Sequence, residues 1–281
     1  MKYLSPFLLI IYAIGLTSCR TLPKASEAET GVTGAALKLK TGNIGVDFVI
    51  HKPRTRFADA FLIFHGTVES DQQSLGAAKK TLAMTRKLVQ RDDALYVSVS
   101  YPQENHLMGD NFKFAESALL WLKKDAPRAL DIEIRKIFLI GHSQGGYLVT
   151  RLNTLHNTDG VIANAPGPLN FKLRCELEES KKIPASDYCQ KMSARFGSTR
   201  VNASAYEQRS LLSHIQNFKS KILFVQGLGD TKLQLTSWPI LKSKIAECAT
   251  CRNAQFVELE GGHAALFENP KGSEIVQKFL D

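Results

Sequence analysis

The 281-residue sequence has no apolar run long enough to cross a lipid bilayer as a helix. Its longest such run, residues 3–16, spans 14 residues, whereas a membrane span needs roughly 20. The chain also lacks internal repeats and low-complexity stretches, and it is 44% hydrophobic and 22% charged. A wholly disordered, collagen-like or multi-span membrane protein is therefore excluded. A chain of this length can bury the core of one large α/β domain or of two smaller ones.

Motifs that bind nucleotides or metal ions are also missing. Gly227-Leu228-Gly229 lacks the third glycine of a dinucleotide-binding fingerprint, and no phosphate-binding glycine loop or metal-ligand cluster is present. We therefore expect no cofactor and no metal. The 36 Lys and Arg against 27 Asp and Glu give a net charge of +9, which indicates either an anionic partner or only a basic, solvated surface. No recognition motif accompanies this charge, so we do not expect nucleic-acid binding.

The N-terminus has the pattern of an export signal. Lys2 precedes the 14-residue apolar run, and small residues follow it. Leu16-Thr17-Ser18-Cys19 resembles the bacterial lipobox, in which the cysteine is diacylated and becomes the first residue of the mature chain. A plain secretory signal with an incidental cysteine is the alternative. We predict a lipoprotein signal peptide over residues 1–18, with Cys19 as the lipid anchor.

Residues 19–36 have almost no large apolar side chains and are predicted to form a flexible tether. The expected location is the bacterial cell envelope, with the protein anchored to a membrane and facing the periplasm or the exterior. Removal of residues 1–18 leaves a formal charge of +8. Anionic headgroups are then one partner for this charge, and a solvated basic face is the other interpretation.

Export bears on the remaining cysteines, Cys175, Cys189, Cys248 and Cys251, because an oxidising compartment favours disulfides. Three pairings are possible, and proximity favours Cys175 with Cys189 and Cys248 with Cys251. The first bond closes a loop whose ends are 14 residues apart, for which chain entropy gives about 3 kcal/mol. A redox or zinc pair at Cys248 and Cys251 is the alternative, but a second CxxC and a thioredoxin-like context are absent.

From about residue 44, short β-branched or aromatic runs alternate with segments of helical periodicity. We expect strands at 44–51, 60–65, 95–101, 137–141, 161–165, 222–226 and 255–259, and helices at 74–89, 115–124, 144–155, 237–247 and 272–280. This alternation predicts an α/β domain over residues 37–281, with a mostly parallel sheet and helices on both faces. Residues 167–218 are polar and break the pattern, so we expect an irregular, lid-like insertion there.

A nucleophile motif follows the strand expected at 137–141. Gly141-His142-Ser143-Gln144-Gly145 has the form G-x-S-x-G between a strand and a helix, a tight turn that exposes Ser143. The start of the helix offers backbone N–H groups to a developing anion, so Gln144 N–H is an expected oxyanion-hole donor. The second donor is expected in the turn after strand 60–65. There we favour Thr67 N–H, with Gly66 next.

A serine hydroxyl needs a base to activate it, and the base needs an orienting carboxylate. Asp230 follows the strand expected at 222–226, 87 residues beyond Ser143, and His263 follows the next strand, 33 residues further on. His263 would take the Ser143 proton and return it to the leaving group, while Asp230 would hold the imidazole and stabilise its charged form. Asp230 as a mere turn residue and Glu260 as the acid are the alternatives.

The order Ser143, Asp230, His263 resembles that of the α/β-hydrolase superfamily. More narrowly, residues 44–281 resemble the catalytic domain of the prolyl oligopeptidase family of serine peptidases. That likeness rests on Gly-x-Ser143-x-Gly-Gly-Tyr147, on Tyr206-Glu207-Gln208-Arg209-Ser210, which is similar to the family's Y-x-x-R-S, and on the Asp230 and His263 loops. It implies an α/β-hydrolase fold and acyl transfer through an acyl-Ser143 intermediate without a cofactor.

Peptidases of that family usually carry an N-terminal β-propeller, whereas here a tether precedes the domain, and many stand-alone relatives resemble esterases. We therefore expect a serine hydrolase that cleaves a small ester or a short peptide, with a carboxylesterase or acyl hydrolase of small esters as the alternative. A non-catalytic envelope lipoprotein on a hydrolase scaffold is a third interpretation. The sequence leaves the oligomeric state undetermined.

Overall fold

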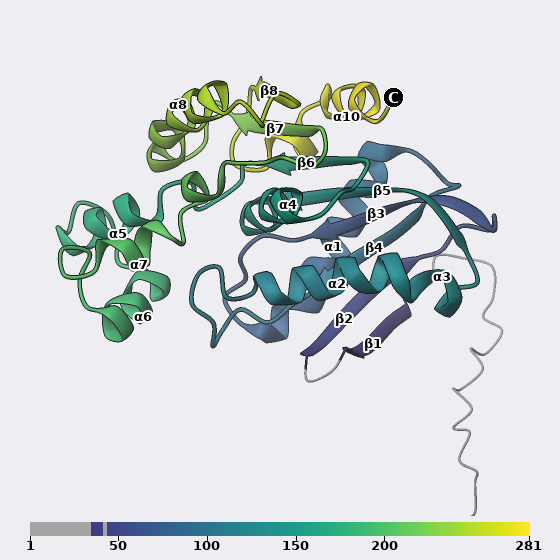
Figure 1. The fold of residues 1–281 in the computed structure, drawn as a ribbon, viewed down its shortest axis with the longest axis horizontal. Helices are drawn as coiled ribbons and strands as arrows, with labels where there is room; N and C mark the ends of the chain where they lie inside the picture. Colours follow the sequence, from purple (N-terminus) through teal and green to yellow (C-terminus); the bar gives the residue numbers. More distant parts are fainter. Residues whose placement is uncertain (1–34, 42–43) are drawn as a thin grey trace, which may run out of the picture. The chain divides into compact units, whose positions relative to one another are not determined.

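The computed structural model describes residues 35–41 and 44–281. Within these residues, eight strands form one sheet in the order β1-β2-β4-β3-β5-β6-β7-β8 (Figure 1). All neighbouring strands from β4 to β8 run parallel, whereas β2 is antiparallel to both β1 and β4. The strands are β1 (Ala35–Thr41), β2 (Ile44–His51), β3 (Phe57–Phe64), β4 (Leu95–Ser100), β5 (Glu133–His142), β6 (Gly160–Asn164), β7 (Ile222–Gly227) and β8 (Ala254–Leu259).

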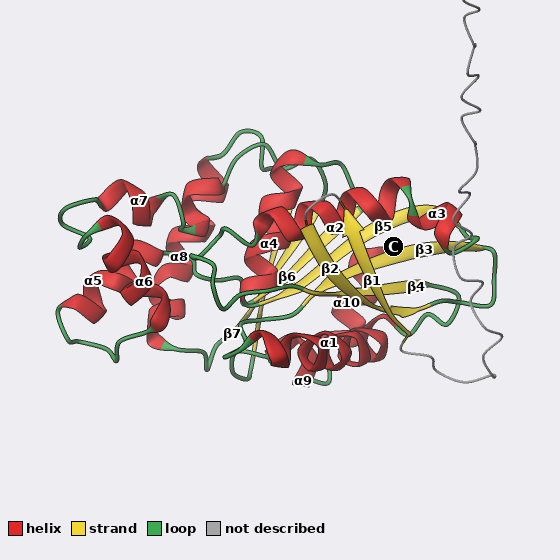
Figure 2. Ribbon diagram, turned by 90° about the horizontal axis from the view of Figure 1, so that it is seen from below, coloured by secondary structure: helices red, strands yellow, loops and turns green. Residues whose placement is uncertain are grey.

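Helices cover both faces of this sheet (Figure 2). One face carries α1 (Ser74–Val89), α9 (Ala265–Glu268) and α10 (Gly272–Leu280), and the other carries α2 (Phe112–Lys124), α3 (Ala126–Ala129), α4 (Gln144–Leu155) and α8 (Lys232–Glu247). Alternate side chains of β3 enter the two layers, with Leu62 and Phe64 on one face and Phe61 and Ile63 on the other. Because β3 is covered on both faces, its sequence is a nearly continuous apolar run. The predicted mostly parallel α/β fold is confirmed.

The strand β1 was not expected from the sequence. It begins at Ala35, inside the segment 19–36 that the sequence assigns to a tether, and it pairs only with β2 at the edge of the sheet. Its sequence, AALKLKT, alternates apolar and charged residues over only a few positions, which is a weak signal beside the long apolar central strands.

The insertion at 167–218 is helical, so the prediction of an irregular segment was wrong. It contains α5 (Phe171–Glu179), α6 (Asp187–Phe196), α7 (Ala203–Glu207) and the 3₁₀ turn η2 (Leu211–His214), and α5 to α7 lie beyond one end of the sheet in Figure 1. Capping side chains start all three α-helices: Asn170, Ser186 and Asn202 each accept a backbone N–H three residues onward. Polar composition hid these short helices from periodicity, although the caps were present in the sequence.

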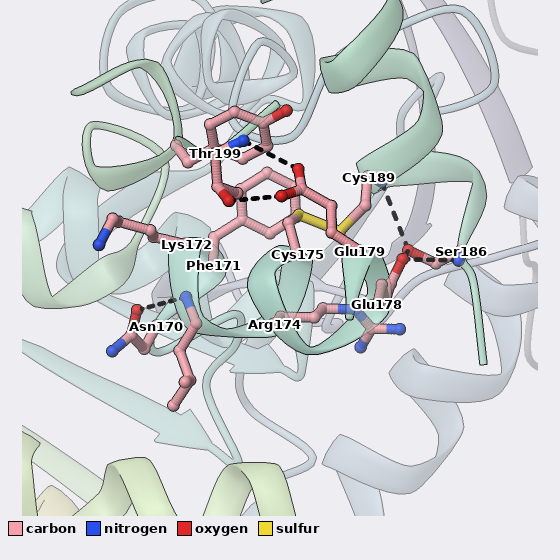
Figure 3. The surroundings of a disulfide bond; sticks show 12 residues. Asn170, Phe171, Lys172, Arg174, Cys175, Glu178, Glu179, Ser186, Cys189 and Thr199 are labelled. Atoms are coloured by element: carbon pink, nitrogen blue, oxygen red, sulfur yellow. Dashed lines mark hydrogen bonds and ion pairs between the residues drawn. A yellow bond between two sulfur atoms is a disulfide. The ribbon is translucent and has the colours of Figure 1, made fainter. Parts of the chain in front are cut away.

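The disulfide between Cys175 and Cys189 joins α5 to α6 (Figure 3). Beside it, the buried Glu178 carboxylate accepts hydrogen bonds from Arg174 Nε at 2.8 Å and from Ser186 N at 2.7 Å. A second disulfide joins Cys248 to Cys251. These are the two pairs that proximity in the sequence favours.

The lipobox and Cys19 lie outside the described residues. Across 35–41 and 44–281, none of the helices combines the length and the apolar character needed to cross a bilayer.

Candidate active site

Parallel strands bring their carboxyl ends to one edge of a sheet, and the chemically important loops follow those ends. The turn 65–67 follows β3, Ser143 follows β5, Asp230 comes after β7 and His263 comes after β8. The fold therefore collects, at one edge, residues that are up to about 200 positions apart in the sequence.

Ser143 occupies a strained backbone conformation between β5 and α4. Its φ is 55° and its ψ is −117°, a region that residues other than glycine rarely adopt. A Cβ on Gly145 would collide with the Phe64 carbonyl, and one on Gly141 would collide with the Gly145 carbonyl. The turn is thus closed by backbone packed on backbone, which explains why the sequence places glycines two residues before and two residues after Ser143.

Asp230 and His263 form a hydrogen-bonded pair. His263 Nδ1 lies 2.8 Å from Asp230 Oδ2, and the Asp230 side chain is fully buried. Burial alone would raise the pKa of this carboxyl group, but hydrogen bonds from His263, Gln226 and the Thr231 backbone N–H outweigh it and lower the pKa below its ordinary value. Asp230 therefore stays ionised, as an orienting carboxylate must. The rival acid Glu260 is exposed at the surface.

Ser143 and His263 line the same space at the sheet edge. Both contribute to a cavity of about 870 Å³ walled by the insertion, and both also line a cavity of about 610 Å³ beside α1 and α9. Shared lining of one cavity is the expected arrangement for a serine and its histidine base, because in unliganded enzymes the hydrogen bond between them is often long and tightens only when substrate binds. A substrate placed at the junction of the two cavities would meet both side chains.

The two expected oxyanion donors flank the nucleophile. Gln144 is the first residue of α4, so its N–H has no partner within the helix. The turn after β3 approaches closely, because a Cβ on Gly66 would lie 3.2 Å from Ser143 Cβ. The next residue, Thr67, lines both cavities together with Ser143. The arrangement suits a carbonyl carbon at Ser143 Oγ with its oxygen between the two loops.

Asn164 at the end of β6 is hydrogen-bonded to both the Ser143 and the His263 loops, and no sequence motif marks it. Its fully buried side-chain N–H₂ donates to the His263 backbone carbonyl at 3.1 Å and to His142 Nδ1 at 2.8 Å, while the backbone carbonyl of Asn164 accepts Ser143 N–H at 2.9 Å. An asparagine that ends an apolar strand was the available signal, because a buried polar side chain must find partners.

Two glutamines support the acid. Gln226 Nε2 donates to Asp230 Oδ2 at 2.8 Å, and Gln234 Nε2 donates to Gln226 Oε1 at 3.1 Å. Gln226 stands at the end of a buried strand, so the sequence contained the same kind of signal that Asn164 gives.

Two other histidines at this edge, His65 and His142, have lowered pKa values that favour the neutral imidazole. Burial lowers the pKa of His65 to about 4, and burial together with the neighbouring His263 lowers the pKa of His142 to about 4. Of the histidines at this edge, the one that a carboxylate orients is His263. Within the described residues, no group of three or more His, Cys, Asp or Glu side chains is arranged to hold a metal ion.

Comparison with solved structures agrees with this architecture. A truncated carbohydrate esterase from gut microbiota superposes with a TM-score of 0.65 at 14% identity, over 87% of this chain and 95% of its own. An esterase from Pyrobaculum calidifontis gives 0.59 at 15% identity, over 88% of this chain and 82% of its own. The acylaminoacyl peptidase of Pyrococcus horikoshii gives 0.57 at 15% identity, over 85% of this chain but only 39% of its own. The chain has the α/β-hydrolase fold.

No protein-family model matches the sequence. No curated protein matches it either.

Proposed function

We propose that the protein is a serine hydrolase that cleaves an ester or a peptide bond by acyl transfer. The observation that carries this proposal is the Asp230–His263 hydrogen bond beside a strained Ser143 on the wall of a shared cavity. His263 would accept the Ser143 proton as Oγ attacks the substrate carbonyl, and the Gln144 and Thr67 N–H groups would stabilise the resulting oxyanion. His263 would then protonate the leaving group, and water would release the acyl group by the same route.

An ester is the substrate class that we favour. Two of the structural neighbours are esterases, with TM-scores of 0.65 for the carbohydrate esterase and 0.59 for the Pyrobaculum esterase, against 0.57 for the acylaminoacyl peptidase. A peptidase of the prolyl oligopeptidase type remains the second candidate, supported by the short motifs around Ser143 and Tyr206.

Labelling with a fluorophosphonate probe tests the enzyme class. We expect the wild-type protein to be labelled and Ser143→Ala to remain unlabelled while keeping the wild-type melting temperature. An unlabelled wild type, beside a serine hydrolase that reacts under the same conditions, would refute the proposal.

Substrate class requires a separate experiment. A panel of p-nitrophenyl esters of increasing chain length, run beside aminoacyl and proline-containing p-nitroanilides, should show turnover of esters, with Ser143→Ala as the blank. Faster cleavage of the p-nitroanilides than of the p-nitrophenyl esters would indicate that the protein is a peptidase.

We also propose that the enzyme is attached to a membrane of the bacterial envelope by acylation of Cys19. The lipobox-like Leu16-Thr17-Ser18-Cys19 and the polar segment behind it support this. Metabolic labelling with an alkyne fatty acid should mark the wild type and fail on Cys19→Ser, and that variant should move from the membrane fraction to the soluble fraction. Wild type that takes up no label would exclude the anchor.

A further inference from the structure

The buried side-chain amide of Gln103 is hydrogen-bonded to the oxyanion loop, by which we mean residues 66–68 after β3. Gln103 follows β4 and is 3% exposed. Its Oε1 accepts Val68 N–H at 3.1 Å, and its Nε2 donates to the Gly66 carbonyl at 3.2 Å. These bonds lie on either side of Thr67, so a single side chain fixes the backbone both before and after the expected donor.

The backbone that carries Gln103 is itself held firmly. Asp71 Oδ1 accepts Gln103 N–H at 2.6 Å and Glu104 N–H at 3.0 Å. Just before it, the Tyr101 hydroxyl donates to the His65 carbonyl at 2.6 Å. The segment after β4 and the turn after β3 are thus connected at several points, although they lie more than thirty residues apart in the sequence.

The insertion reaches the same amide. Tyr188 on α6 donates its hydroxyl to Gln103 Oε1 at 3.4 Å. Burial raises the pKa of this phenol, and the neighbouring Thr67 and Gln144 side chains partly offset the increase. Tyr188 therefore lies among the side chains of the two residues whose N–H groups are the expected oxyanion donors. Its neighbour in the sequence, Cys189, is bonded to α5.

We propose that Gln103 is a positioning residue that sets the Thr67 N–H for oxyanion stabilisation and links that loop to the insertion through Tyr188. This inference rests on the proposed serine hydrolase function and adds to it the residue that shapes the oxyanion hole. Gln103 also lines the larger cavity, but both polar atoms of its side chain are bonded to the loop backbone, so we expect it to act through the loop. An amide is required because the loop presents one donor, Val68 N–H, and one acceptor, the Gly66 carbonyl; a carboxylate could serve only the first.

Gln103→Met tests this directly, because methionine has a similar volume but lacks the donor and the strong acceptor. Displacing a catalytic group slightly, or removing one oxyanion donor, costs on the order of 100-fold in rate. We expect kcat for a p-nitrophenyl ester to fall about 10-fold to 100-fold with KM nearly unchanged. Gln190→Met makes the same substitution at an exposed position of α6 and should leave both parameters at wild-type values.

A second readout separates oxyanion stabilisation from general loosening of the structure. The sulfur of a thionoester accepts hydrogen bonds more weakly than a carbonyl oxygen, so its hydrolysis depends less on the oxyanion hole. The ratio of kcat/KM for an ester to that for the matching thionoester should therefore shrink in Gln103→Met. If both substrates lose rate by the same factor, or if only KM changes, the proposed role is wrong.

The link to the insertion is tested by Tyr188→Phe, which removes one hydroxyl and keeps the aromatic ring. We expect a smaller fall in kcat, about threefold to tenfold, that is not additive with Gln103→Met because residues in one network share their effect. Additive losses would refute the link. Activity that is present in the wild type but unaffected by Gln103→Met would overturn this inference alone, whereas an inactive wild type would overturn the proposed function as well.

Discussion

The sheet and the insertion are stabilised in different ways. Two large apolar clusters, one on each face, include or pack against side chains from every strand between β2 and β8. The insertion has a small apolar cluster, to which Met108 from the loop after β4 also contributes; its other members are Phe171, Cys175, Cys189, Met192, Ala205 and Tyr206. A disulfide and polar bonds such as those of Glu178 to Ser186 and Arg174 also hold the insertion.

This difference separates two tasks. The sheet holds Ser143, Asp230 and His263 on loops anchored in a large core, which gives the geometry that chemistry requires. The insertion walls the larger cavity and buries much less apolar surface, so it can open locally without unfolding the sheet. We therefore expect substitutions in the sheet loops to abolish the proposed reaction. Substitutions in the insertion should alter local stability and substrate binding or, at Tyr188, lower kcat only a few fold.

The largest expected effect tests the chemistry assigned to the sheet. Asp230→Asn should lower kcat about 10⁴-fold, as removal of the orienting carboxylate does in other triads. Asp230 Oδ2 accepts from both His263 and Gln226, and an amide N–H₂ at that place could accept from neither. Steady-state ester hydrolysis measures the loss, and circular dichroism should show an intact fold. A loss below about tenfold would mean that Asp230 is not the triad acid.

An intermediate effect tests the independence of the insertion. Loss of the disulfide in Cys175→Ser/Cys189→Ser should make opening of α5 and α6 easier by about 3 kcal/mol, because the bond closes a loop of 14 residues. Hydrogen exchange of α5 and α6 amides reports this opening, while the melting temperature of the sheet should change little. Cys248→Ser/Cys251→Ser, whose bond spans 3 residues, is the matched control and should cost about half as much. If the sheet and the insertion lose stability together, the two regions form one cooperative unit.

The smallest expected effect is a pH dependence of stability caused by His65, which is buried at the edge of the sheet that carries the candidate site. His65 has a folded-state pKa of about 4 against an ordinary value of 6.5. Between pH 6.5 and pH 4, therefore, the His65 imidazole binds a proton in the unfolded chain but not in the native state. Stability from this group is complete above pH 6.5 and is lost as pH falls toward 4. The contribution of His65 to the free energy of unfolding should decrease by about 2 kcal/mol between pH 7 and pH 5.

Urea unfolding at several pH values measures this change. His65→Asn, which keeps a donor for the Gly66 carbonyl, should reduce the slope of unfolding free energy against pH, even if the variant is less stable at every pH. An unchanged slope would show that His65 does not account for the loss.

The sequence predicted the central strands and several helices well, although α8 begins at Lys232, five residues before the predicted start. Expected helices at 74–89, 144–155 and 272–280 have the observed bounds of α1, α4 and α10, because long apolar periodicity reflects burial directly. The helices α5 to α7 were missed because each is short and mostly polar, and β1 was missed because its alternation covers few residues.

The candidate site divides along similar lines. The motif around Ser143 and the loops of Asp230 and His263 have local signals, since glycines mark tight turns after strands. Asn164, Gln226 and Gln103 have no comparable motif. Their roles depend on partners such as His263, Asp230 and Val68, whose positions the strand order alone decides.

By itself, then, the sequence determined the alternation of strands and helices, the order of the candidate nucleophile, acid and base, and the proximity of each cysteine pair, because each of these follows from local pattern and spacing. Only the tertiary structure decided that the insertion is helical, that Tyr188 reaches the oxyanion loop, and that three buried amides hold the catalytic loops in place. The physical reason is that a hydrogen bond between residues distant in sequence depends on how the strands and helices pack. No short sequence motif reveals that packing.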